Sequence, residues 1–143
     1  MKGSCFCGGI AFEITGKIPS LYQCHCSECR KTTGAAANAA FIVRCDNFRW
    51  LQGDGLIKTF VKASGFRVNF CMTCGSPVPN VISALPQMMW IPAGLMDDPL
   101  PVKITHHLHV ASKANWDEIG GTGEQHAMMP DDLSVLLPPP NKP

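Results

Sequence analysis

Seven of the eight cysteines in this 143-residue chain lie in three tight groups, which constrain its fold more than any other feature. The groups have the spacings CxC, CxCxxC and CxxC, and they consist of Cys5 and Cys7, then Cys24, Cys26 and Cys29, then Cys71 and Cys74. Two cysteines of a CxC pair cannot form a disulfide with each other without strain. Such short spacings instead allow several thiolates to bind one metal ion, although disulfides remain the alternative.

The rest of the sequence predicts a cytoplasmic protein, and this prediction favours metal binding. The N-terminal residues begin an alternating pattern rather than an apolar run, and the most apolar stretch, 88–96, contains Pro92 and Gly94. We therefore expect no export signal and no membrane span. In the reducing cytoplasm, clustered cysteines hold metal more often than they form disulfides. Because the net charge is +1 and there is no basic run, we expect no nucleic-acid partner.

The chain is predicted to be mostly β, because thirteen glycines and twelve prolines divide it into short segments in which apolar residues tend to alternate. The expected strands are 10–15, 39–43, 48–51, 56–61, 66–70, 78–83, 89–92 and 102–110. One short helix is expected after the CxCxxC group, with Ser27 as its N-cap and Gly34 at its end. We predict a single domain over 1–129, followed by a proline-rich tail over 130–143 that is a surface strap or disordered.

The spacings assign the cysteine groups to two different kinds of site. The CxxC and CxC pairs are each followed by glycine and together supply four thiolates, which predicts a closed structural zinc site on Cys5, Cys7, Cys71 and Cys74. The CxCxxC group supplies only three thiolates and leaves one zinc position open, as catalytic zinc sites do. An iron–sulfur cluster is the alternative, but no common ferredoxin spacing is present.

The eighth cysteine and the histidines receive no metal in this interpretation. Cys45 has no partner at short spacing and is interpreted as a small apolar residue of the core. His25 points away from Cys24 and Cys26 in an extended chain. We therefore expect it either to contact the metal ligands without binding the metal or to be exposed. We expect His107 and His109 on one face of a strand and His106 on the other, without a catalytic role.

Three segments resemble the glutathione-dependent formaldehyde-activating enzyme family, whose domain is shared with centromere protein V. They are GSCFCGGI from Gly3, CHCSECRKTTG from Cys24 and FCMTCGS from Phe70, and weaker likeness continues through 91–99 and 107–116. The resemblance implies a mostly β fold called the β-tent. It also implies two zinc ions, a structural one on Cys5, Cys7, Cys71 and Cys74 and a catalytic one on Cys24, Cys26 and Cys29.

The resemblance further implies carbon–sulfur lyase activity on an adduct such as S-hydroxymethylglutathione, with a small thiol such as glutathione as the partner. Zinc with an open position can bind the thiolate or polarise the carbonyl or hydroxyl oxygen of the adduct. Arg30 and Lys31, directly after Cys29, are candidates to bind a substrate carboxylate, although a solvated helix face is the alternative. The alternative function is a non-enzymatic zinc-binding β module for protein–protein interaction.

Overall fold

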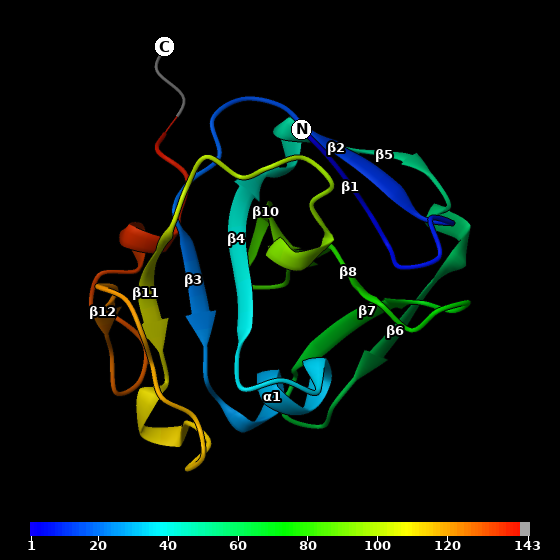
Figure 1. The fold of residues 1–143 in the computed structure, drawn as a ribbon. Coiled ribbons are helices and arrows are strands. Elements are labelled where there is room, and N and C mark those ends of the chain that lie inside the picture. Colours follow the sequence, from blue (N-terminus) through cyan, green and yellow to red (C-terminus); the bar gives the residue numbers. More distant parts are fainter. Residues whose placement is uncertain (141–143) are drawn as a thin grey trace.

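The computed structural model describes residues 1–140, which contain twelve β-strands and one α-helix. The strands are β1 (Lys2–Ser4), β2 (Ala11–Ile14), β3 (Leu21–Cys24), β4 (Asn38–Arg44), β5 (Phe48–Gln52), β6 (Ile57–Val61), β7 (Arg67–Cys71), β8 (Pro77–Val78), β9 (Asn80–Ile82), β10 (Leu85–Pro92), β11 (Ile104–Leu108) and β12 (Glu124–Gln125). The helix α1 (Ser27–Thr33) lies between β3 and β4 (Figure 1). The predicted mostly β fold with one short helix after the CxCxxC group is confirmed. Within residues 1–140, no helix is long and apolar enough to span a membrane.

The strands form one six-stranded sheet and two three-stranded sheets (Figure 1). The large sheet has the order β12-β11-β3-β4-β10-β9, and the small sheets have the orders β1-β2-β5 and β6-β7-β8. The pairs are antiparallel, except that β11 runs parallel to both β3 and β12. A parallel neighbour requires a long crossover connection, and the chain between β3 and β11 provides it.

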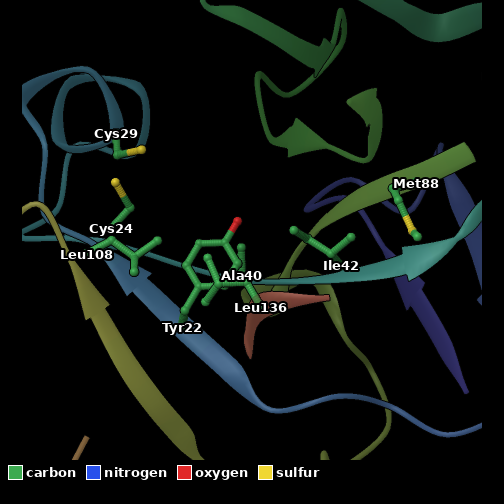
Figure 2. Close-up of a cluster of buried hydrophobic side chains, with 8 residues drawn as sticks. All are labelled: Tyr22, Cys24, Cys29, Ala40, Ile42, Met88, Leu108 and Leu136. Carbon is green, nitrogen blue, oxygen red and sulfur yellow. The ribbon is translucent and has the colours of Figure 1, made fainter. Parts of the chain in front are cut away.

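Strand β4 lies at the centre of the hydrophobic core because both of its faces are covered. Successive side chains of a strand point to opposite faces, so Ala40 and Ile42 enter one cluster while Phe41 and Val43 enter another. This double burial explains the run of apolar residues in β4. Figure 2 shows the first cluster, which consists of Tyr22, Cys24, Cys29, Ala40, Ile42, Met88, Leu108 and Leu136.

Two expected strands differ from the structure at identifiable residues. The expected strand 78–83 is divided at Pro79 into β8, which pairs with β7, and β9, which pairs with β10. Pro79 has no N–H to donate, so one continuous ladder cannot cross it. The expected strand 102–110 ends at Leu108, because His109 has a left-handed φ of 54°. His109 therefore does not share a strand face with His107, and that prediction was wrong.

The described part of the proline-rich tail contacts the core. It contains a 3-10 turn, Leu133–Leu136, in which Leu136 is 6% exposed and belongs to the cluster in Figure 2. Leu136, with Leu137 packed beside it, fastens this part of the tail to the large sheet. The last part of the predicted tail, 141–143, lies outside the described residues, and the domain boundary at 129 stays a prediction.

Gly53 allows the loop before β6 to approach the turn that carries the first cysteine pair. Its φ is 76°, and a Cβ at this position would overlap the carbonyl group of Gly9, with the carbonyl carbon 2.8 Å away. We expect Gly53→Ala to destabilise the protein by about 2 kcal/mol or more, which lowers Tm by roughly 6 °C. Gly55→Ala, where a Cβ meets nothing within 4 Å, is the matched control. Equal Tm values for the two variants in thermal melts would contradict this role of Gly53.

Candidate metal centres

The first cysteine cluster joins the turn after β1 to the end of β7. The sulfur atoms of Cys5, Cys7, Cys71 and Cys74 all lie within 4.8 Å of one another. The Cys5 and Cys7 sulfurs are 3.5 Å apart, and those of Cys7 and Cys71 are 3.8 Å apart. Four thiolates bound to one tetrahedral zinc ion at about 2.3 Å would be separated by about 3.8 Å. The donor set and its spacing therefore fit a zinc ion.

Hydrogen bonds within the CxxC turn favour ionised sulfur. The side chain of Ser76, whose Oγ lies 3.3 Å from Cys74 Sγ, and its backbone N–H lower the pKa of Cys74 to about 5. A hydrogen bond from the Cys74 backbone lowers the pKa of Cys71. Gly75 permits this turn by taking a left-handed φ of 77°. Because a metal must displace the thiol proton, the lowered pKa values of Cys71 and Cys74 favour metal binding at neutral pH. A backbone hydrogen bond from Gly9 lowers the pKa of Cys7, but the other cluster thiols and burial outweigh it and raise this pKa to about 11.

The second cysteine cluster lies where β3 passes into α1. Its three sulfurs, from Cys24, Cys26 and Cys29, also lie within 4.8 Å of one another. Cys24 is 8% exposed and Cys29 is 9% exposed, and Figure 2 shows the sulfur atom of Cys24 directed toward Cys29. The neighbouring Cys29 thiol lowers the pKa of Cys24 to about 6, and the same contact raises the pKa of Cys29. The contact thus favours one ionised and one protonated sulfur, and a metal ion would displace the remaining proton.

The start of α1 differs from the prediction. The N-cap is Cys26 rather than Ser27, and its sulfur accepts a hydrogen bond from the backbone N–H of Cys29 at 3.4 Å. The helix ends as expected at Gly34, which has a left-handed φ of 66°. A sulfur that caps a helix is held at a fixed position relative to that helix. The helix cap therefore helps to bring Cys26 and Cys29 to one point.

His25 directly follows β3, and it is buried rather than exposed. It is 1% exposed, and its Nε2 lies 3.1 Å from Nδ1 of His107. Its Nδ1 lies 3.7 Å from the carboxylate of Asp117, a residue that the sequence analysis did not single out. Burial lowers the pKa of both histidines. The buried histidine pair therefore links the residue between Cys24 and Cys26 to β11.

A cavity of about 320 Å³ adjoins the second cluster and has Cys24 and Cys29 in its wall. This volume lies within the range of small-molecule sites. Tyr22, Phe66 and Trp90 contribute aromatic surface. Besides Tyr22 and the two cysteines, the polar lining residues are Thr32, Asn38, Arg67, Asn80 and Ser83. The cavity therefore places apolar surface and a few polar groups beside two candidate metal ligands.

Tyr22 is the polar group of this wall that shares a strand face with a cluster cysteine. It precedes Cys24 by two residues on β3, so both side chains point to the same face of the sheet. Burial raises the pKa of Tyr22, and its hydroxyl stays protonated at neutral pH. Tyr22 was not predicted as a site residue, because an aromatic residue in a strand cannot be distinguished from a core residue by pattern alone.

The remaining candidate residues do not line this cavity. Arg30 donates a hydrogen bond to the Ser112 carbonyl at 3.4 Å, and Lys31 lines a groove between α1 and the β6-β7-β8 sheet that adjoins the cavity at Thr32, Phe66 and Val68. Their predicted contact with substrate stays a prediction. Cys45 lies in neither cysteine cluster, and its thiol contacts the carbonyl oxygen of Pro86 at 3.6 Å.

Comparison with known proteins agrees with the site geometry. The sequence pattern of the family described as glutathione-dependent formaldehyde-activating enzyme matches residues 1–112. This chain belongs to that family. A protein of Halomonas elongata with the provisional name glutathione-dependent formaldehyde-activating enzyme is 28% identical over an alignment of 132 positions, and the alignment covers 83% of this chain and 80% of that protein. A crystal structure of a Rhodobacter sphaeroides protein shares the fold, with a TM-score of 0.59 at 22% identity over 73% of this chain and 100% of that chain.

The match to the formaldehyde-activating enzyme family spans both cysteine clusters and most of the cavity. All seven clustered cysteines fall within residues 1–112, as do Tyr22, Arg67 and Trp90. The segment that carries β12 lies beyond the match. Features that involve β12 are therefore outside what the family comparison describes.

Proposed function

We propose that this protein is a zinc-dependent carbon–sulfur lyase that acts on a thiol–aldehyde adduct of the S-hydroxymethylglutathione type. The observation that most supports this proposal is the open CxCxxC cluster with two of its sulfurs in the wall of a cavity. A scaffold has no use for such an arrangement, whereas a ligand in the cavity can reach a metal held by the cysteines. The family match supports glutathione and formaldehyde as the first compounds to test.

The proposed catalytic and structural ions differ in the number of their protein ligands. Cys24, Cys26 and Cys29 would hold a zinc ion whose remaining position binds a thiolate or polarises an oxygen atom. The four thiolates of the first cluster would fill every position of the other ion, which gives it a structural role. We therefore propose two zinc ions per chain.

The cavity residues have roles that follow from the bonds of the reaction. Cleavage breaks the bond between carbon and sulfur, and one proton passes from the hydroxyl oxygen of the adduct to the sulfur of the released thiol. No oxidant or reductant is required. The protonated hydroxyl of Tyr22 can donate a hydrogen bond to the adduct oxygen, and Arg67 can pair with a carboxylate of the thiol partner. The aromatic rings of Phe66 and Trp90 limit the access of water.

One observation supports the alternative function, a zinc-binding module that docks another protein. Strand β6 is an edge strand, and its residues Phe60 and Val61 are 58% and 51% exposed. An exposed apolar edge is a surface on which another chain can pair. The two functions differ in what the CxCxxC cluster binds, because docking through β6 requires no small ligand in the cavity.

Cobalt substitution tests the proposed function directly. Co²⁺ bound by thiolates absorbs visible light, and we expect these bands to shift when glutathione is added, because its thiolate enters the coordination sphere. S-methylglutathione, which has no ionisable thiol, should leave the bands unchanged. Lyase turnover of S-hydroxymethylglutathione is measured on the zinc form. Unchanged spectra with glutathione, cysteine and other small thiols would rule out direct thiol binding and favour the docking module.

A further inference from the structure

We propose that His106, Glu124 and His126 form an additional binding site for a divalent cation of the zinc type at the β11–β12 edge of the large sheet. One ligand atom from each of the three residues lies within 4.8 Å of the other two. The site shares no residue with either cysteine cluster. It also uses β12, which lies beyond the family match, so it is independent of the proposed lyase function.

Backbone pairing brings the three side chains to one face. In the parallel pair of β11 and β12, His106 is directly opposite Glu124. His126 follows Glu124 by two residues, and its backbone N–H donates to the His107 carbonyl at 2.8 Å. Side chains two residues apart on an extended segment share a face, and so do directly opposed residues on neighbouring strands. The register of the two strands therefore predicts that the three side chains lie close together, whatever rotamers they adopt.

The close approach of the two strands depends on Gly123. A Cβ at Gly123 would lie 2.9 Å from Cδ2 of His107, which is tighter than van der Waals contact allows. Further along, the N–H of His109 donates to the Met128 carbonyl at 2.9 Å. The segment that carries Glu124 and His126 is thus held against β11 on both sides of the proposed site. These contacts fix the backbone positions of the ligand residues.

The distances and donor types suit zinc. Nδ1 of His106 lies 3.1 Å from Nε2 of His126 and 3.9 Å from a carboxylate oxygen of Glu124. Two imidazole nitrogens bound at about 2.0 Å to a tetrahedral zinc ion are separated by about 3.3 Å. Two histidines and one carboxylate are a common ligand set for zinc that keeps an open position. The carboxylate is too far from His106 for a hydrogen bond, and a cation between them would neutralise its charge.

The exposure of the three residues provides an entry path for the ion. The His106 side chain is 14% exposed, whereas that of Glu124 is 69% exposed. A cation can therefore bind Glu124 first and then reach the histidines, and water can fill the remaining coordination positions. Bound in this way, the ion would fasten the segment with β12 to the edge of the large sheet.

Zinc content measured on matched variants tests the proposed site. The full chain, wild type or His126→Ala, is dialysed against micromolar free Zn²⁺ and its zinc is measured by elemental analysis. We expect the variant to bind one equivalent less than the wild type, whatever the occupancy of the cysteine sites. Gln125→Ala changes the neighbouring residue of β12 on the other face and should retain the wild-type content. Glu124→Gln, at an exposed position, should weaken binding at least about tenfold if the carboxylate is a ligand.

A spectroscopic readout separates this site from the cysteine clusters. Once the cysteine sites are loaded, further Zn²⁺ should shift the imidazole NMR signals of His106 and His126 and leave those of the buried pair, His25 and His107, in place. Equal zinc contents for wild type, His126→Ala and Glu124→Gln, with unshifted signals, would show that His106 and His126 are a hydrogen-bonded pair only. That result would overturn the proposal and leave the lyase proposal untouched.

Discussion

Replacing Cys71 by serine is expected to abolish the folded state at room temperature. Cys71 is fully buried, in a small cluster with Cys5, Ile10 and Val78. Structural zinc sites contribute on the order of 10 kcal/mol, which is comparable to the whole stability of a typical domain, about 5–15 kcal/mol. A serine hydroxyl is a weak zinc ligand. Without a bound zinc ion, this hydroxyl would also be a buried polar group, which costs free energy.

The β6-β7-β8 sheet explains why other interactions cannot compensate for the loss of the zinc site. Of the residues in its three strands, only Cys71 and Val78 are buried, and β6 exposes most of its side chains. A sheet with so little apolar burial cannot hold its place by the hydrophobic effect alone. The zinc ion would link this sheet to the turn after β1, and we infer that this link is its main attachment to the rest of the protein.

Thermal melting and zinc content of Cys71→Ser measure this effect. Thr73→Ser, an exposed change within the same CxxC turn, is the matched control and should melt like the wild type. We expect the Cys71 variant to be insoluble, or to show no cooperative transition and at least one zinc equivalent less. A wild-type melting curve with full zinc content would show that the first cluster does not stabilise the fold.

The cysteine clusters could be recognised from the sequence because metal binding imposes short and regular spacings. Several short strands were harder to find. Strand β3 has only four residues and includes the polar Gln23, and β1 and β12 are shorter still. Such segments carry too few alternating residues to stand out from loops. The cap of α1 was missed for a different reason, because serine is a far commoner N-cap than cysteine.

The cavity and the histidine pairs could not be predicted, because they depend on contacts between distant segments. His25 and His107 are 82 residues apart in the chain, and they meet because β11 pairs with β3 in parallel. Tyr22 and Trp90 reach the same cavity from two different strands of the large sheet. Neither contact follows from the local spacing of residues. To predict such contacts, one must know the strand order and the register, which a single sequence does not fix.

The second large effect is expected for Cys26→Ser, which should remove activity while the fold remains. Cys26 is the N-cap of α1, and serine is among the best N-cap residues, so the helix should keep its start. Cys24 and Cys29, by contrast, are buried in the core, where substitution would also disturb packing. The Cys26 variant therefore removes one soft metal ligand with the least structural damage.

We expect Cys26→Ser to lose the zinc of the second cluster and at least about 10³-fold in lyase turnover, because a metal ion contributes several kcal/mol to stabilising the reacting charge. Its Tm should stay within a few degrees of the wild type, in contrast to Cys71→Ser. Cys45→Ser is the matched control, since Cys45 belongs to neither cluster, and it should retain both zinc content and turnover. Elemental analysis, thermal melting and a turnover assay on the same preparations distinguish the possible outcomes. Loss of the fold in Cys26→Ser would assign the second cluster a structural role, and full turnover without its zinc would remove the cluster from the reaction.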